Sequence, residues 1–364
     1  FLVNADGSLG ARNDVHCVSI EHKMGIKASP TAVLQYGDHG GAIGYLVGQE
    51  NRGLEYMFVM MNAARFAVGQ QGIAVAERAY QKAVQYARDR VQSRPVDGSL
   101  NTAAPIIHHP DVKRMLMTMR AYTEGCRAMA FVAAAALDAA HAHPDAAVRK
   151  QNQAFYEFMV PLVKGYSTEM SLEVTSLGVQ VHGGMGFIEE TGAAQYYRDA
   201  KILTIYEGTT AIQANDLVGR KTARDGGATV RAICEQIQDT EAQLSARSSE
   251  AAKAAGKRLT AARLALLDAA AFIAGGAKAS PNAVFAGSVP YLMLAGNVMA
   301  GWQLARSLIA AEDQLAAGVE ADFMRAKITT ARFYADHILS KAPGVRDSIV
   351  DGAAGVTEMA LDAF

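Results

Sequence analysis

The carboxylate of Glu207 is a candidate base in this sequence of 364 residues. It stands in the run Tyr206-Glu207-Gly208-Thr209-Thr210, directly before a segment with helical spacing. Its neighbours Ile205 and Tyr206 carry no charge, and apolar surroundings make a carboxylate a stronger base. An acid at a helix start is nevertheless more often structural, because it complements the positive end of the helix dipole. Taken alone, the run leaves both interpretations open.

The glycine-rich run Gly183-Gly184-Met185-Gly186 is a second candidate. Repeated glycines let a backbone turn sharply or approach a ligand closely. The run matches neither the dinucleotide fingerprint GxGxxG nor the phosphate loop GxxxxGK, and no βαβ pattern surrounds it. No GxSxG nucleophile elbow and no matched Cys and His pair stands out, so hydrolase chemistry has no basis in the sequence.

Histidines and cysteines give no pattern of a metal site. No CxxC or HExxH motif occurs, and the pairs His108/His109 and His141/His143 lack the spacing that places two ligands on one helix face. Both pairs are interpreted as surface or capping residues. An odd number of distant cysteines favours buried free thiols in a reducing compartment over a disulfide framework. The cysteines are Cys17, Cys126 and Cys234.

The bulk composition excludes several kinds of partner. Apolar residues make up 50% of the chain, charged residues 20%, and the formal net charge is -1. This balance gives no electrostatic footprint for nucleic acid or anionic lipid. Residues 279–305 carry no charge, but Asn282, Pro290 and Asn297 interrupt them. We therefore expect a buried helix there and no stable membrane insertion.

The texture of the chain changes near residue 53. Before it, β-prone runs at 16–20 and 42–47 alternate with turn residues. After it, apolar residues recur at helical spacing and predict helices from 53 to about 93, from 110, from 155 to 181 and from 209. The chain starts at Phe1 in mid-pattern without a signal-peptide core, as expected of a fragment or trimmed product.

The turn Asp225-Gly226-Gly227 predicts a boundary. Beyond it, Ala-rich helices are expected over residues 229–256, 257–275, 290–317 and 321–340. The expected fold is mainly α: the end of a small β-domain (1–52), an antiparallel helix bundle (53–226) and an appended helical domain (227–364).

Several ordered motifs across residues 1–224 resemble the acyl-CoA dehydrogenase family. The C-terminal three are QVHGGMGF at 180–187, RDAK at 198–201 and IYEGTTAIQ at 205–213. Earlier matches are EHKMGIKASPT at 21–31, MMNAAR at 60–65 and YARDRVQ at 86–92. Residues 227–364 resemble the extra helical domain of long, mostly bacterial members, including those acting on short methylthio-acyl-CoA substrates.

The resemblance implies an FAD enzyme that converts an acyl-CoA thioester to a trans-2-enoyl-CoA. Glu207 matches the base that removes the α-proton, and its apolar flanks are expected to desolvate it. Gly208 and Tyr206 match positions beside the acyl thioester, while Asn62 and Arg65 match the pair that meets the CoA portion. Some members carry the base just before Arg65, where this chain has Ala64, which cannot accept a proton.

Cofactor positions carry over in the same way. Arg90 and Gln92 match flavin-contacting residues, and Gln180 with Gly184 matches the loop that receives the ADP half of FAD from a neighbouring subunit. Thr209 matches a further FAD contact. The chain departs from the family pattern at two places: Ser93-Arg94 replaces a common Phe-Gly, and Ala211 replaces a polar residue of some relatives.

The resemblance also implies partners and a compartment. A homodimer or homotetramer is expected, with an electron-transfer flavoprotein as electron acceptor and the bacterial cytoplasm, or else the mitochondrial matrix, as location. The alternatives are an acyl-CoA oxidase, a catalytically silent subunit, and a non-enzymatic DNA-binding flavoprotein of the same fold. Acidic residues among the C-terminal cations weigh against DNA binding, and the retained Glu207 weighs against a silent subunit.

Overall fold

The computed structural model describes all 364 residues and divides into two compact units, Phe1–Ala63 and Ala64–Phe364. The first unit holds one antiparallel hairpin, in which β1 (Val15–Ile20) pairs with β2 (Ala32–Tyr36). The strand-and-turn texture is confirmed there. The run 42–47 forms no strand, however, and the thiol of Cys17, expected to be buried, is exposed.

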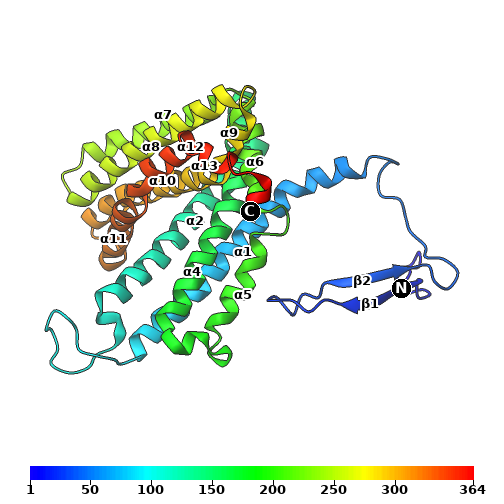
Figure 1. Ribbon diagram of the computed structural model, residues 1–364, viewed down its shortest axis with the longest axis horizontal. Coiled ribbons are helices and arrows are strands. Elements are labelled where there is room, and N and C mark those ends of the chain that lie inside the picture. Colours follow the sequence, from blue (N-terminus) through cyan, green and yellow to red (C-terminus); the bar gives the residue numbers. More distant parts are fainter. The chain divides into compact units, whose positions relative to one another are not determined.

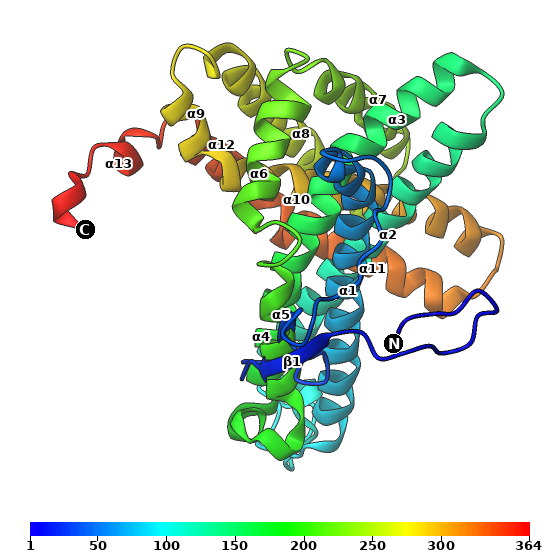
Figure 2. The same cartoon turned by 90° about the vertical axis from the view of Figure 1, so that its right-hand side faces the viewer.

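The second unit is helical, and part of it is an elongated bundle. From Ala64 onward α1 (Gly53–Asp89) lies beside α2 (Pro110–Ala142), α4 (Ser167–His182) and α5 (Ala193–Leu203) (Figure 1; Figure 2). Small and apolar side chains of α1, α2 and α4 form one buried cluster between them. This layout confirms the expected helix bundle.

A π-helical turn interrupts the chain between α3 (Ala146–Pro161) and α4. The turn spans Leu162–Tyr166, and all five of its residues are buried. Pro161 lacks a backbone N–H, so the regular hydrogen-bond ladder cannot continue through it. The single helix expected over 155–181 is therefore wrong: it is two helices joined by this turn, and the first begins at residue 146.

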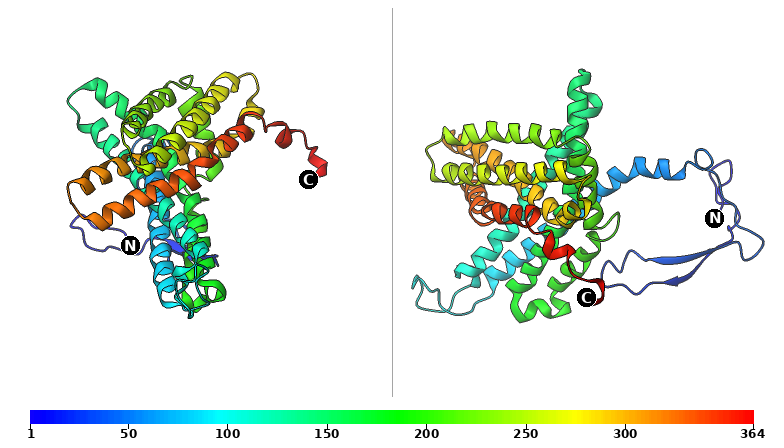
Figure 3. Two further views of the ribbon diagram at one scale, coloured as in Figure 1. Left: turned by 90° about the vertical axis from the view of Figure 1, so that its left-hand side faces the viewer. Right: turned by 45° about the horizontal axis from the view of Figure 1, so that its top comes forward.

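The C-terminal helices pack around a central one. They are α7 (Ala228–Ser245), α8 (Glu250–Gly276), α9 (Pro281–Ala286), α10 (Ser288–Ala316), α11 (Ala321–His337), α12 (Ala342–Val350) and α13 (Ala354–Thr357). Helix α10 contacts α8, α11 and α12 on one side and α2 and α6 (Thr210–Val218) on the other. Figure 3 shows α7 to α12, yellow-green to red, against one end of the bundle, while α13 near the C-terminus projects away from them in its left view.

One continuous core joins the bundle to the C-terminal helices. Tyr166 of the π-helical turn donates to Asn297 Oδ1 at 2.7 Å and lies 3.0 Å from the hydroxyl of Tyr334, so α10 and α11 are bonded to the bundle through buried polar groups. Buried polar groups that satisfy one another specify a single packing arrangement. The proposed boundary near residue 226 thus lies within one compact unit.

Several helix limits differ from the sequence prediction. No break occurs at 256/257, because Gly256 lies inside α8 and the helix starts where Ser249 accepts a hydrogen bond from Ala252 N at 3.0 Å. Helix α5 was not predicted at all. Helix α1 ends at Asp89, some residues before the expected stop near 93.

Helix α8 is long and apolar enough to cross a membrane, judged by length and composition alone. A helix packed in a protein core passes the same test, and α8 contacts α7, α10, α11 and α12. The uncharged stretch 279–305, weighed above as a span, covers α9 and much of α10. It supplies many of the buried core residues, as expected.

Candidate active site

Glu207 lies in a tight turn between α5 and α6. Its φ of 54° is left-handed, and that of Gly208 is 92°. A left-handed backbone costs a residue with a Cβ about 1–2 kcal/mol. At Gly208 an added Cβ would lie 2.8 Å from Gln213 Nε2, so only glycine fits. Such strain persists only where the surroundings hold it, and it is common at functional sites.

The carboxylate of Glu207 is exposed in this chain. The expectation that its apolar flanks desolvate it is therefore wrong. Ile205 is itself 47% exposed, and Tyr206 is turned onto the bundle, where its hydroxyl donates to Gln71 Oε1 at 2.5 Å. The two neighbouring side chains leave this carboxylate open to solvent.

A group of charged side chains lies behind the turn. Arg65 of α1 pairs with Asp216 of α6 at 3.6 Å, and both side chains are about nine-tenths buried. Arg220 approaches the same carboxylate at 3.5 Å. Arg65 was expected to meet CoA. The structure engages one end of its guanidinium with Asp216, while its Nε has no hydrogen-bond partner.

Lys164 of the π-helical turn is fully buried beneath the Glu207 turn. Its Nζ donates to Gly208 O at 2.6 Å. Burial lowers the pKa of Lys164 to about 8, because the cation is desolvated, while the carboxylates of Glu169 and Glu207 act in the opposite direction. Sequence reasoning did not select Lys164. The only hint in the sequence is that this lysine directly follows an apolar run.

Two threonines fix the start of α6. Thr209 is the N-cap residue, and its hydroxyl accepts a hydrogen bond from Ile212 N at 3.3 Å. Thr210 donates to Glu169 Oε1 at 2.5 Å. The structure thus gives Thr209 a local role that the sequence comparison with the family had not assigned to it. Asn62 is exposed on α1 within the first unit.

The other candidate residues line a cavity at the far end of the bundle. Arg90, Gln92, Gln180 and Gly184 surround an open cavity of about 580 Å³. It lies between the end of α1, the start of α2 and the end of α4. His182 helps to form its floor, stacked on Tyr86 at 4.3 Å between ring centroids. Four of the five expected FAD positions therefore meet at one place.

The cavity and the Glu207 turn are well separated. Tyr206, next to Glu207, bonds to Gln71 of α1, and Arg90 lies 19 residues further along the chain, roughly 28 Å away at 1.5 Å per residue. The residues predicted for the substrate and most of those predicted for the cofactor therefore occupy opposite ends of the bundle.

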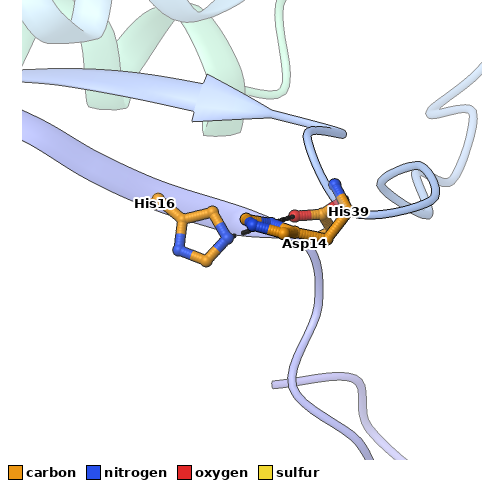
Figure 4. Close-up of side chains that lie close together, drawn as sticks. All are labelled: Asp14, His16 and His39. Atoms are coloured by element: carbon orange, nitrogen blue, oxygen red, sulfur yellow. Dashed lines mark hydrogen bonds and ion pairs between the residues drawn. The ribbon is translucent and has the colours of Figure 1, made fainter.

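A third group of chemical interest lies in the first unit and was missed. Asp14 Oδ1 lies 3.1 Å from His16 Nε2 and 3.2 Å from His39 Nδ1, and Figure 4 shows both rings directed at this carboxylate. The two histidines come from β1 and from the turn after β2, so no local motif announces them. Asp14 also accepts hydrogen bonds from two backbone N–H groups in that turn, which gives the cluster a structural role.

Comparison with known proteins places this architecture. Residues 51–221 match the family model described as the acyl-CoA dehydrogenase C-terminal domain, and residues 230–360 match the one described as acetyl-CoA dehydrogenase C-terminal like. The chain belongs to the acyl-CoA dehydrogenase family. The two models meet on either side of the turn at 225–227.

Two similar curated members of this family come from bacteria. The chain is 55% identical to 3-methylmercaptopropionyl-CoA dehydrogenase of Ruegeria pomeroyi over 96% of its own length and 59% of that protein's. It is 38% identical to the broad-specificity linear acyl-CoA dehydrogenase FadE5 of Mycobacterium tuberculosis, over 100% of this chain and 62% of the relative. The chain thus spans about three-fifths of each.

Solved structures share the fold. An acyl-CoA dehydrogenase of Bacillus anthracis complexed with FAD superposes with a TM-score of 0.72 at 21% identity, over 95% of this chain and 58% of that one. The acyl-CoA dehydrogenase ACDH-11 of Caenorhabditis elegans, in complex with C11-CoA, gives 0.73 at 19% identity, over 96% and 56%. The mainly helical fold predicted for the chain is confirmed.

Proposed function

We propose that the chain is the C-terminal part of an FAD-dependent acyl-CoA dehydrogenase in which Glu207 removes the α-proton of the thioester. The observation that carries this proposal is the strained turn that presents Glu207 on a framework 55% identical to an acyl-CoA dehydrogenase. Proteins retain left-handed non-glycine residues where the surrounding structure over-determines them. A carboxylate held in this way and open to a ligand suits a general base.

The chemistry requires a base in a dry site. A thioester α-proton is far less acidic than a carboxylic acid with a pKa of about 4.3, so the carboxylate must lose water to become basic enough. Because Glu207 is exposed in this chain, we infer that bound acyl-CoA and the rest of the holoenzyme exclude the water. Glu207 then accepts the α-proton at a carboxylate oxygen.

The far cavity fits part of FAD. The loop residues Gly183 and Gly184 have no atom within 4 Å of an added Cβ, which leaves their backbone open to a ligand, and Arg90 offers a permanent cation at the rim. Arg90, Gln92, Gln180 and Gly184 would hold the cofactor there. When bound beside the substrate, FAD supplies the acceptor for the β-hydride, which no side chain can provide.

The separation of the two places implies an oligomer. A cofactor that reacts beside Glu207 would have to span the bundle to reach the cavity of the same chain, roughly 28 Å away along α1 from Gln71 to Arg90. We infer that each cavity serves a cofactor whose reactive end lies in a neighbouring subunit, so that a homodimer is the smallest active form.

Short acyl-CoA thioesters are the proposed substrates. The relative at 55% identity is named for 3-methylmercaptopropionyl-CoA and the one at 38% for linear acyl-CoA, so this substrate class and an unbranched chain have direct support. We further propose an electron-transfer flavoprotein as electron acceptor, because a relative at 28% identity is a subunit of a caffeyl-CoA reductase-Etf complex.

The test uses the full-length holoprotein and follows flavin absorbance without oxygen. Among saturated CoA thioesters of increasing length, 3-methylmercaptopropionyl-CoA and butyryl-CoA should bleach the flavin fastest. Air is then admitted to the reduced enzyme. The flavin of an oxidase is reoxidised by oxygen, whereas that of a dehydrogenase stays reduced until the electron-transfer flavoprotein is added. If no acyl-CoA bleaches the flavin, the proposed function is wrong.

A further inference from the structure

The π-helical turn Leu162–Tyr166 is held rigidly by the helices around it. An added Cβ at Gly69 of α1 would clash with the carbonyl oxygen of Val163, so α1 touches the backbone of the turn directly. On another side, Leu292 of α10 packs on Gly165, and its Cδ2 would lie 2.8 Å from a Cβ there. A residue projecting from this turn has little freedom to move.

Lys164 projects from this turn to the backbone at the candidate base. Its Nζ donates to Gly208 O at 2.6 Å, across 44 residues of sequence. Gln213 Nε2 adds weaker hydrogen bonds of 3.3 Å to the carbonyl oxygens of Glu207 and Gly208. Glu207 and Gly208, whose carbonyl oxygens accept these hydrogen bonds, are the two residues of the turn with left-handed φ angles.

Burying a lysine side chain costs hydration free energy, which the interactions of its ammonium group must offset. For a buried ammonium this loss of hydration amounts to several kcal/mol. No carboxylate forms an ion pair with Lys164 within 4.0 Å. Its charge therefore does not serve a salt bridge, and its one strong bond is to the Glu207 turn.

We propose that Lys164 is a positioning residue, which holds the Gly208 carbonyl and thereby fixes the left-handed turn that presents Glu207 to the substrate. The proposal rests on the function proposed above for Glu207. A shift of about 1 Å in a catalytic group costs on the order of 100-fold in rate, so a loosened turn has a large effect without any loss of a reacting group.

The decisive experiment replaces Lys164 by Met in the full-length holoprotein, with Lys150→Met, an exposed lysine of α3, as the matched control. Two readouts are needed. In Lys164→Met the backbone amides of residues 205–209 should lose at least tenfold in protection against hydrogen exchange. Flavin reduction should slow about 100-fold, while the Kd for acyl-CoA changes little. The melting temperature should change little, because relief of the hydration cost of the ammonium offsets the lost donor to Gly208 O.

Lys164→Gln keeps a hydrogen-bond donor without the charge, and it keeps the proposal testable if Lys164→Met fails to fold. In this variant the amides of residues 205–209 should recover part of their protection against exchange. The wild-type protection should also step down as the pH rises through about 8, where Lys164 loses its proton. The charged groups facing Lys164 are Glu169 on α4, Arg65 on α1 and Glu207 itself, while α10 presents Leu292. Lys164→Met should lack this step.

Unchanged protection in Lys164→Met, or equal slowing in Lys150→Met, would overturn the proposal. Failure of the proposed function is seen separately: wild-type enzyme would then leave the flavin oxidised with every acyl-CoA, while the exchange readout would still report on the turn.

Discussion

The turn at Glu207 and the cavity at Arg90 differ in how the protein supports them. Behind the turn lie three buried charged side chains, Lys164, Arg65 and Asp216, and the backbone itself is strained. Around the cavity, Arg90 and Gln180 are exposed and the glycine loop is open. A group that must meet a particular proton needs a fixed position, whereas a recess for an extended cofactor needs only a shaped floor and reachable donors.

Among the substitutions that test this difference between the turn and the cavity, we expect the largest structural effect in the glycine loop at the cavity. In Gly186→Val, the new side chain would clash with the carbonyl oxygen of Val179, so the loop 183–187 must move. We expect a loss of about 1–3 kcal/mol in unfolding free energy and more than a tenfold rise in the Kd for FAD. Thermal unfolding and a flavin titration check this. Gly275→Ala in α8, where an added Cβ meets nothing within 4 Å, is the control: it should leave FAD binding unchanged and should not lower the unfolding free energy.

The next effect separates cofactor holding from chemistry. Arg90→Ala removes a cation at the rim, and we expect about a tenfold rise in the Kd for FAD, as for a lost hydrogen bond to a charged group. At saturating FAD the rate of flavin reduction should be normal. Arg94→Ala, an exposed arginine outside the cavity, should bind FAD normally. If flavin reduction in Arg90→Ala stayed slow at saturating FAD, Arg90 would take part in the chemistry as well as in cofactor binding. The cavity and the Glu207 turn would then act as one site.

At the Glu207 turn, the cap of α6 should have a moderate effect. Thr209→Ala removes the acceptor for Ile212 N and should cost about 1 kcal/mol in unfolding free energy. Thr209→Ser keeps a hydroxyl and should lose less than half of that. If Thr209→Ala instead leaves stability unchanged and weakens FAD binding, Thr209 acts mainly in cofactor binding, as the family resemblance implies, and not as a helix cap.

The smallest effect concerns the strain itself. Glu207→Gly relieves a left-handed residue with a Cβ, but a glycine also gains freedom in the unfolded chain, so we expect stability to stay equal or rise by up to about 1 kcal/mol. Glu235→Gly, an exposed position inside α7, should instead lose about 1 kcal/mol. Denaturant unfolding distinguishes the two. Equal losses would show that the turn is unstrained.

The same comparison explains what could be predicted from the sequence. Gln180 with Gly184, and Arg90 with Gln92, were assigned to FAD through the resemblance of their motifs to the family, and the two residues of each pair lie within four positions of one another. That both pairs share one cavity follows from how α1, α2 and α4 pack, which no local pattern encodes. The assignment of these residues to FAD remains a prediction.

The support of Glu207 could be predicted even less. Lys164 lies 44 residues before its acceptor, in a π-helical turn that the helical spacing hides. The burial expected for Glu207 was inferred from its sequence neighbours, but Ile205 is itself exposed and Tyr206 bonds to Gln71 of α1. Helix breaks were misplaced for a related reason: Gly256 looked like a stop, whereas Ser249, a side-chain cap, is where the new helix starts.

The central claim is that the turn performs the proton abstraction and the cavity does not. The most direct measurement is anaerobic stopped-flow bleaching of the flavin in the full-length Glu207→Gln variant, loaded with FAD and mixed with an acyl-CoA that the wild type oxidises. The amide is nearly isosteric, so FAD and acyl-CoA should still bind, and bleaching should slow by about 10² to 10⁴. Glu190→Gln, an exposed acid in the loop before α5, should bleach at the wild-type rate. Bleaching of Glu207→Gln at a rate comparable to wild type would contradict the assignment of the base.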